Sequence, residues 1–308
     1  NFSDAKAPIY GFPKMVDRRI DYTMTTLPSL LTGRKVVQVK AVSNEELLVK
    51  FIEATLTFVR WTRQTTALSD AFNDCVNVAS FGQLGHPYCQ LFHASLVACQ
   101  ENDAGLEYWR ESHFLLSRIG EIFRVSFQNV PFLKHYLRPK EPRRLHPNRR
   151  ANQHLRFFNT VRDSAINPNI GLVFAHTTIF HGEDGNKFEN SSIAPIPGSL
   201  SGTGPRDSLQ LVDVFFGQLR RAMELAGIWE ETAVIVAAGH GYVSANRNFH
   251  SIPYMVKLPR STKGGSIDIQ FDTSGTRELV QGIRRNRIRS GEDLKAFVSG
   301  EVYQPSLQ

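Results

Sequence analysis

Three histidines follow runs of apolar residues that have the character of buried strands. His176 comes directly after residues 170–175, and His181 follows five residues later. His240 comes just after residues 232–238. Near-continuous apolar strands separated by helical patterns favour a parallel or mixed sheet with helices on both faces. Such sheets bind ligands at the carboxyl ends of their strands, so we expect the three histidines to surround one site. Neutral imidazole is a good ligand for zinc and similar divalent ions.

A cluster of hydroxyl groups near the start of the chain is the second feature that could do chemistry. Thr23, Thr25 and Thr26 precede a short helix that we predict around residues 27–31, and Pro28 fits the first turn of that helix. A threonine hydroxyl is a poor nucleophile by itself, and coordination to a metal is one way to activate it. The same hydroxyls could instead cap the helix. The residues alone allow both interpretations.

The elements that must position these groups can be read from the apolar pattern. We predict strands over residues 36–39, 46–52, 55–60, 75–81, 170–175 and 232–238. We predict helices over residues 106–127, 151–162 and 207–225. The chain of 308 residues therefore reads as a single α/β domain, with a proline-rich basic linker at 131–150 and a long surface loop at 182–206.

Composition narrows the kinds of partner. The formal charge of +7 suits an anionic small molecule or lipid headgroup. The basic clusters at 138–150 and 284–289 lack interleaved aromatic residues, so we expect no nucleic-acid binding, and we interpret them as solvated basic surfaces or as anion-steering groups. No stretch approaches the ~20 apolar residues of a transmembrane helix. Because the chain begins with Asn, an upstream targeting or membrane anchor is compatible with it.

Three segments, in this order, resemble the alkaline phosphatase superfamily, particularly its sulfatase and phosphoethanolamine transferase branches. Thr23 lies ten residues before Gly33 of a Leu-Leu-Thr-Gly run, where those families place a Cys, Ser or Thr. The pair His176 and His181 matches two histidines five residues apart after a strand. Residues 232–241 and 252–259 match an apolar strand ending in Asp-His-Gly and the short strand that follows it.

This resemblance implies a role for each candidate residue. Thr23 would attack a sulfate or phosphate ester and form a covalent intermediate, and with His240 it would bind a divalent metal ion such as zinc, calcium, magnesium or manganese. His181 would contact the anionic oxygens of the substrate, and His176 would support it from the strand end or bind the metal. His250 lies close to the position where these families place another substrate-binding histidine, but it is one residue out of the usual frame. A periplasmic, extracellular or membrane-associated location would follow.

Two departures from the family pattern lead to two alternative hypotheses about function. Gly239 stands where an Asp metal ligand is expected, and the 22 residues before Thr23 contain no apolar strand ending in an acid, so we expect an N-terminally truncated fold. Glu183 and Asp184 could in principle substitute as ligands. The first hypothesis is a sulfatase-like metal-dependent hydrolase or transferase. The alternative is a catalytically inactive sulfatase-like binding or interaction module.

The three cysteines cannot all pair with one another, and none lies in a C-x-x-C motif, which excludes a zinc ribbon or a thioredoxin-type site. The segment from Gly85 to Cys89, taken with Cys99, resembles a feature of some sulfatase-like proteins, which implies a disulfide. Two unconnected buried thiols are the alternative.

Overall fold

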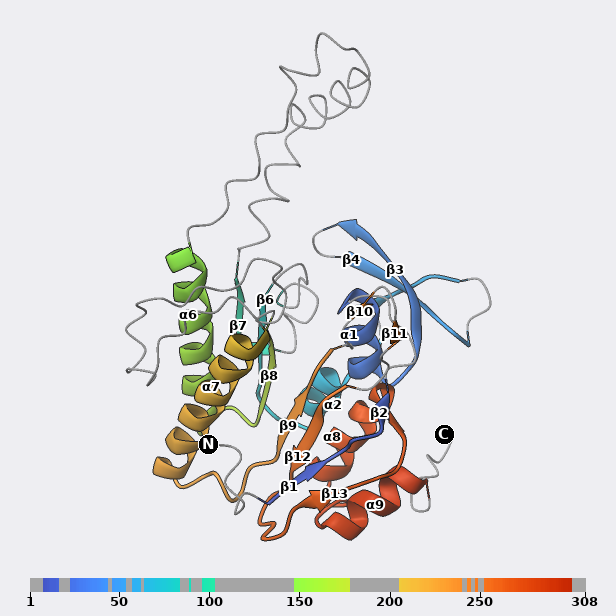
Figure 1. Cartoon of the computed structure of the whole chain (residues 1–308). Coiled ribbons are helices and arrows are strands. Elements are labelled where there is room, and N and C mark those ends of the chain that lie inside the picture. The colour runs from blue at the N-terminus through green and yellow to red at the C-terminus, as the bar shows by residue number, and fades with distance from the viewer. Residues whose placement is uncertain are drawn as a thin grey trace.

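The computed structural model shows an α/β protein in which helices pack on several small sheets (Figure 1). It describes residues 8–16, 23–43, 46–53, 57–61, 64–83, 89, 96–102, 147–177, 205–239, 243–244, 247–248 and 252–300. None of the helices in these ranges combines the length and the apolar character needed to cross a bilayer.

A three-stranded parallel sheet has β6 (Val78–Gln83) at its centre, between β7 (Leu96–Asn102) and β8 (Leu172–His176). One face is covered by α6 (Pro147–Ala165) and α7 (Pro205–Leu225), at the left of Figure 1. Aromatic and aliphatic side chains of both helices pack there against β6. The amphipathic pattern of each helix therefore places its apolar stripe on the sheet.

The other face of the parallel sheet is covered by a second group of elements. This group comprises α1 (Thr23–Thr32), α2 (Ala67–Asn73) and an antiparallel sheet of β3 (Val36–Ser43), β4 (Glu46–Phe51) and β5 (Val59–Arg60). Apolar side chains from both helices, from all three of these strands and from β6 and β8 form one core cluster. The prediction of helices on both faces of a sheet is met around β6.

A mixed sheet of four strands forms the second half of the molecule, in the order β13 (Gly265–Ser266), β1 (Ile9–Gly11), β12 (Tyr254–Lys257) and β9 (Val234–Ala237). β1 is parallel to β13 and antiparallel to β12, which is antiparallel to β9. The residues between β9 and β12 contain the small hairpin of β10 (Val243–Ser244) and β11 (Arg247–Asn248), and no described crossover helix. This connection accounts for the antiparallel pairing.

Helices near the C-terminus cover the mixed sheet. A 3-10 turn, η4 (Thr273–Gly275), leads into α8 (Thr276–Arg284), and α9 (Gly291–Ser299) follows after a short loop. Their apolar side chains pack with those of β1 and β12 into a further core cluster. A short parallel pair, β2 (Met15–Val16) with β14 (Phe271–Asp272), lies beside them.

The structure corrects some of the predicted boundaries. Among the described strands the pairings are both parallel and antiparallel and fall into separate sheets, so the single, mostly parallel sheet is not shown. Residues 147–150, assigned to the linker, form the first turn of α6, where Pro147 is well suited because its missing N–H costs nothing there. Residues 205–206, assigned to the loop, likewise begin α7. The predicted helix 106–127 and the rest of the linker and loop lie outside the described residues.

Candidate functional site

Helix α1 starts earlier than the sequence indicates. Thr23 is its first residue, and Pro28 lies in its interior rather than in its first turn. Thr25 and Thr26 are therefore helical, and neither is the N-cap residue. The side chain of Thr23 lies outside the described part of the structure. Its backbone position nevertheless puts it at the positive end of a helix dipole, where anionic groups are favoured.

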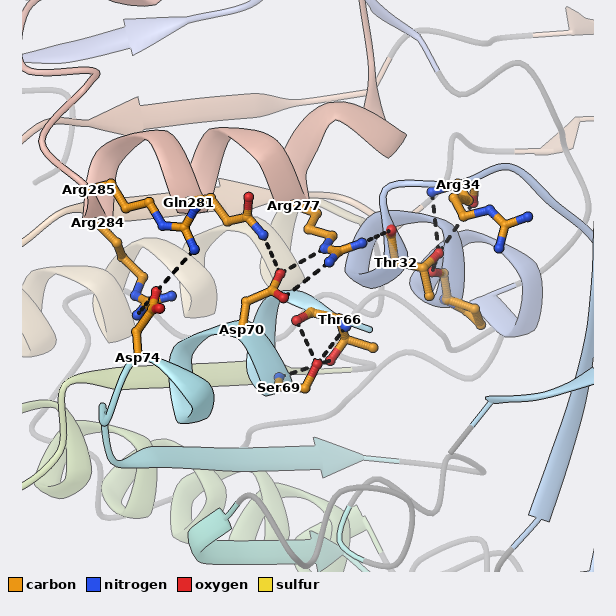
Figure 2. Close-up of polar contacts among 11 residues, drawn as sticks. Thr32, Arg34, Thr66, Ser69, Asp70, Asp74, Arg277, Gln281, Arg284 and Arg285 are labelled. Carbon is orange, nitrogen blue, oxygen red and sulfur yellow. Dashed lines mark hydrogen bonds and ion pairs between the residues drawn. The ribbon is translucent and has the colours of Figure 1, made fainter. Parts of the chain in front are cut away.

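The far end of α1 is held by a network of charged and amide side chains (Figure 2). Arg277 of α8 donates from Nε and Nη2 to the two carboxylate oxygens of Asp70 of α2, at 2.8 and 3.1 Å, and from Nη1 to the backbone carbonyl of Thr32 at 3.0 Å. Gln281 donates a further hydrogen bond to Asp70. The network thus joins α1, α2 and α8.

Gly33 follows α1 in a conformation that explains the glycine of its Leu-Leu-Thr-Gly run. Its φ is +71°, and a Cβ atom there would lie 2.5 Å from Oε1 of Glu278. Both the backbone angle and the close carboxylate favour glycine. Burial raises the pKa of the Glu278 carboxyl, an effect that Arg277 partly offsets. The Glu278 carboxyl group therefore lies against the C-terminal end of α1, beside the Arg277 network.

His176 ends β8 on the side of the parallel sheet that carries α1. Successive side chains of a strand point to opposite faces, so His176 shares a face with Phe174, which packs against the α1 core cluster. Its partner across the ladder is Gly82 of β6, which has no side chain on that face. The expected position of His176 at a carboxyl end of the sheet is met.

Gly239 comes two residues after β9, and the backbone N–H of Ala238 donates to the carbonyl of Pro253 at 3.0 Å. A Cβ atom built at Gly239 meets no heavy atom of the described residues within 4 Å. Glycine supplies no ligand atom, and yet the backbone leaves room for a larger side chain.

Lys257, in the strand after the Gly-His-Gly segment, has a structural role. It is buried, and its Nζ donates to the carbonyls of Trp229 and Thr232 at 2.7 and 3.0 Å while lying over the Trp229 ring. Burial lowers the pKa of its ammonium group, and the nearby Glu230 and Glu231 oppose that shift. Lys257 thereby fixes the loop that leads into β9.

The remaining predicted residues fall elsewhere. His181, His240, His250, Glu183 and Asp184 lie outside the described residues, so their grouping stays a prediction. Within the described ranges no three His, Cys, Asp or Glu side chains come together as a metal site would require. The described side chains alone therefore supply no metal site, and we derive no step through a metal.

The structure joins Cys89 and Cys99 by a disulfide, with their Cα atoms 5.6 Å apart. Of the two alternatives that the sequence allowed, the bonded pair is the one observed. Cys75 is an exposed free thiol. The bond ties a residue between β6 and β7 to the middle of β7.

Comparison with known proteins gives a fold. No family model and no curated protein sequence matches the chain. Among solved structures it is similar to Ps i-CgsB (12% identity, TM-score 0.52, 96% of this chain and 69% of that chain). It is also similar to the lipoteichoic acid synthase LtaP from Listeria monocytogenes (9% identity, TM-score 0.51, 90% and 63%). A third match is an alkaline phosphatase superfamily protein from Vibrio parahaemolyticus (10% identity, TM-score 0.48, 90% and 58%).

The chain therefore shares its fold with Ps i-CgsB and with the Listeria lipoteichoic acid synthase. The chain spans 58% and 63% of the lengths of the Vibrio and Listeria proteins. The fold that the sequence motifs led us to expect is thus confirmed. Local patterns in the sequence pointed to Thr23, His176 and Gly239. They did not predict the pair of Asp70 and Arg277, because these two residues are 207 positions apart in the chain.

Proposed function

We propose that this chain is the core of a sulfatase-like hydrolase or transferase that acts on a sulfate or phosphate ester, with Thr23 as the nucleophile. The observation that carries the proposal is the position of Thr23 at the start of α1, on the same side of the parallel sheet as His176. The fold shared with Ps i-CgsB and the Listeria protein supports it. The Listeria protein, by its name a lipoteichoic acid synthase, supports an anionic small molecule or lipid headgroup as the substrate.

The chemistry follows from what the chain can place there. The Thr23 oxygen forms a bond to sulfur or phosphorus as the bond to the alcohol oxygen breaks, and the released alcohol takes up the hydroxyl proton. Water or an acceptor alcohol then displaces Thr23 and restores its proton. The positive end of α1 favours the anionic group that is transferred.

Gly239 favours a second candidate, a catalytically inactive binding or interaction module. In this proposal His240 and Thr23 are the only metal ligands at their motif positions, and two ligands hold a divalent ion weakly. Glu183 and Asp184 are the acids that could add to them. Zinc, calcium, magnesium and manganese are the ions to test.

The deciding experiment measures release of p-nitrophenol from p-nitrophenyl sulfate and p-nitrophenyl phosphate, with each metal added in turn. We expect turnover that Thr23→Ala lowers by about 1,000-fold or more and that Thr25→Ala, in the same helical turn, leaves within about threefold. A Thr23→Ala variant as active as the wild type would exclude the nucleophile. A wild-type protein with neither turnover nor stoichiometric metal would favour the inactive module.

A further inference from the structure

Pro28 interrupts the hydrogen-bond ladder of α1 close to its start. Proline has no N–H, so the bond that residue 28 would give to the carbonyl of Met24, in the first turn, cannot form. The turn that carries Thr23 therefore begins with one ladder bond fewer than a regular helix. Something else must hold this turn if Thr23 is to keep one position.

The Ser29 hydroxyl forms two hydrogen bonds next to the position of the missing ladder bond. Its hydroxyl donates to the backbone carbonyl of Thr25 at 2.7 Å and accepts the backbone N–H of Val36, the first residue of β3, at 2.9 Å. A single Oγ atom thus joins the first turn of α1 to the neighbouring sheet. Val36 is buried and paired with Phe51 of β4, so the strand end of this link is firmly anchored.

We infer that Ser29 is a positioning residue, which fixes the first turn of α1 against β3 and so fixes Thr23 for attack. This inference rests on the proposed function, because it gives Thr23 a catalytic role. The carbonyl that Ser29 holds belongs to Thr25, two residues from Thr23 in the same turn.

Thr160 of α6 makes a side-chain hydrogen bond like that of Ser29 to Thr25, but, among the described residues, without a link to a strand. Thr160 of α6 donates from its hydroxyl to the carbonyl of Arg156 at 2.9 Å, the same four-residue spacing as Ser29 to Thr25. A bond of this type slightly bends a helix and ties it to nothing else. Thr160→Val is therefore the matched control, since it removes an equivalent bond in a helix away from Thr23.

The first arm of the test is hydrogen exchange of backbone amides in Ser29→Ala, Ser29→Thr and Thr160→Val. We expect Ser29→Ala to speed exchange of the Val36 amide and of the α1 amides by about tenfold or more, with α6 unchanged. Ser29→Thr keeps a hydroxyl and should restore protection. Unchanged exchange at Val36 and α1 in Ser29→Ala would overturn the inference.

The second arm is steady-state kinetics with the better of the two p-nitrophenyl esters. We expect Ser29→Ala to lower kcat by about 10- to 100-fold with KM within about threefold, and Ser29→Thr to recover most of kcat. An equal kcat in the two variants would overturn the positioning role while Thr23→Ala still tests the proposed function. If the wild type has no activity, the proposed function fails, and the exchange arm alone decides whether Ser29 holds the start of α1.

Discussion

Arg277 donates two parallel hydrogen bonds to the carboxylate of Asp70, although the two residues are 207 positions apart in the chain. Both side chains are largely buried, with exposed fractions of 17% and 12%. The third donor of the guanidinium reaches the last residue of α1 through the carbonyl of Thr32. A positive charge at a helix C-terminus is favourable, so this pair stabilises α1 as well as joining α2 to α8.

Removing one partner of this pair should be costly. We expect Arg277→Met to lower the free energy of unfolding by about 3 kcal/mol, because Asp70 is left as a buried charge without its counter-ion. Replacing both residues, with Arg277→Met and Asp70→Leu, should cost less than the sum of the single changes. Urea denaturation measures both. The control is Lys14→Met, at a pair exposed by 57% and 66%, which should cost about 0.5 kcal/mol or less.

Restoring an acid at position 239 should strengthen metal binding. We expect Gly239→Asp to raise the affinity for zinc or manganese by about tenfold or more, since a Cβ atom at Gly239 meets no described atom within 4 Å and the acid adds a ligand next in sequence to His240. Calorimetric titration with each metal salt is the measurement. Gly217→Asp, at a glycine of α7 where an added Cβ atom likewise meets no described atom within 4 Å, is the matched control. Equal gains in the two variants would show that the added charge, and not the position, is responsible.

Glu278 gives a prediction about pH. Because burial raises its pKa in the folded state, the folded protein holds this proton to a higher pH than the unfolded chain does. The free energy of unfolding therefore declines as the pH rises from below the ordinary pKa of a glutamate through the raised one. Glu278→Gln removes this ionisation and keeps the shape. We expect its stability relative to the wild type, from denaturation curves, to be higher at pH 8 than at pH 4; a difference that does not change with pH would contradict the assignment.

The disulfide can be tested by counting thiols. We expect the native protein to react with one equivalent of a thiol reagent, at the exposed Cys75, and the reduced and unfolded protein with three. Replacing Cys89 and Cys99 together by serine should lower the free energy of unfolding by about 2–4 kcal/mol, because the closed loop restricts the unfolded chain. Three reactive thiols before reduction would show that the bond is not formed.

Local patterns in the sequence predicted the elements that carry the candidate site. The apolar runs 170–175 and 232–238 correspond to β8 and β9, and the helical pattern 207–225 to α7. These patterns succeed because the spacing of buried side chains along a strand or a helix is set by local geometry. The start of α1 was predicted too late, since Pro28 is tolerated in its interior, where Ser29 adds a bond to the preceding turn.

By itself the sequence determined the chemistry available to this protein: Thr23, the histidines, and a glycine at 239 in place of an acid. Its motifs also predicted the fold that the chain shares with Ps i-CgsB and the Listeria protein. Tertiary structure alone decided how helix α1, which begins at Thr23, is held, because contacts such as Arg277 with Asp70 and Ser29 with Val36 join different elements of the fold. It likewise decided that the strands around them form both parallel and antiparallel pairs, since pairing depends on how the connections between strands run, and side-chain alternation along one strand does not encode it.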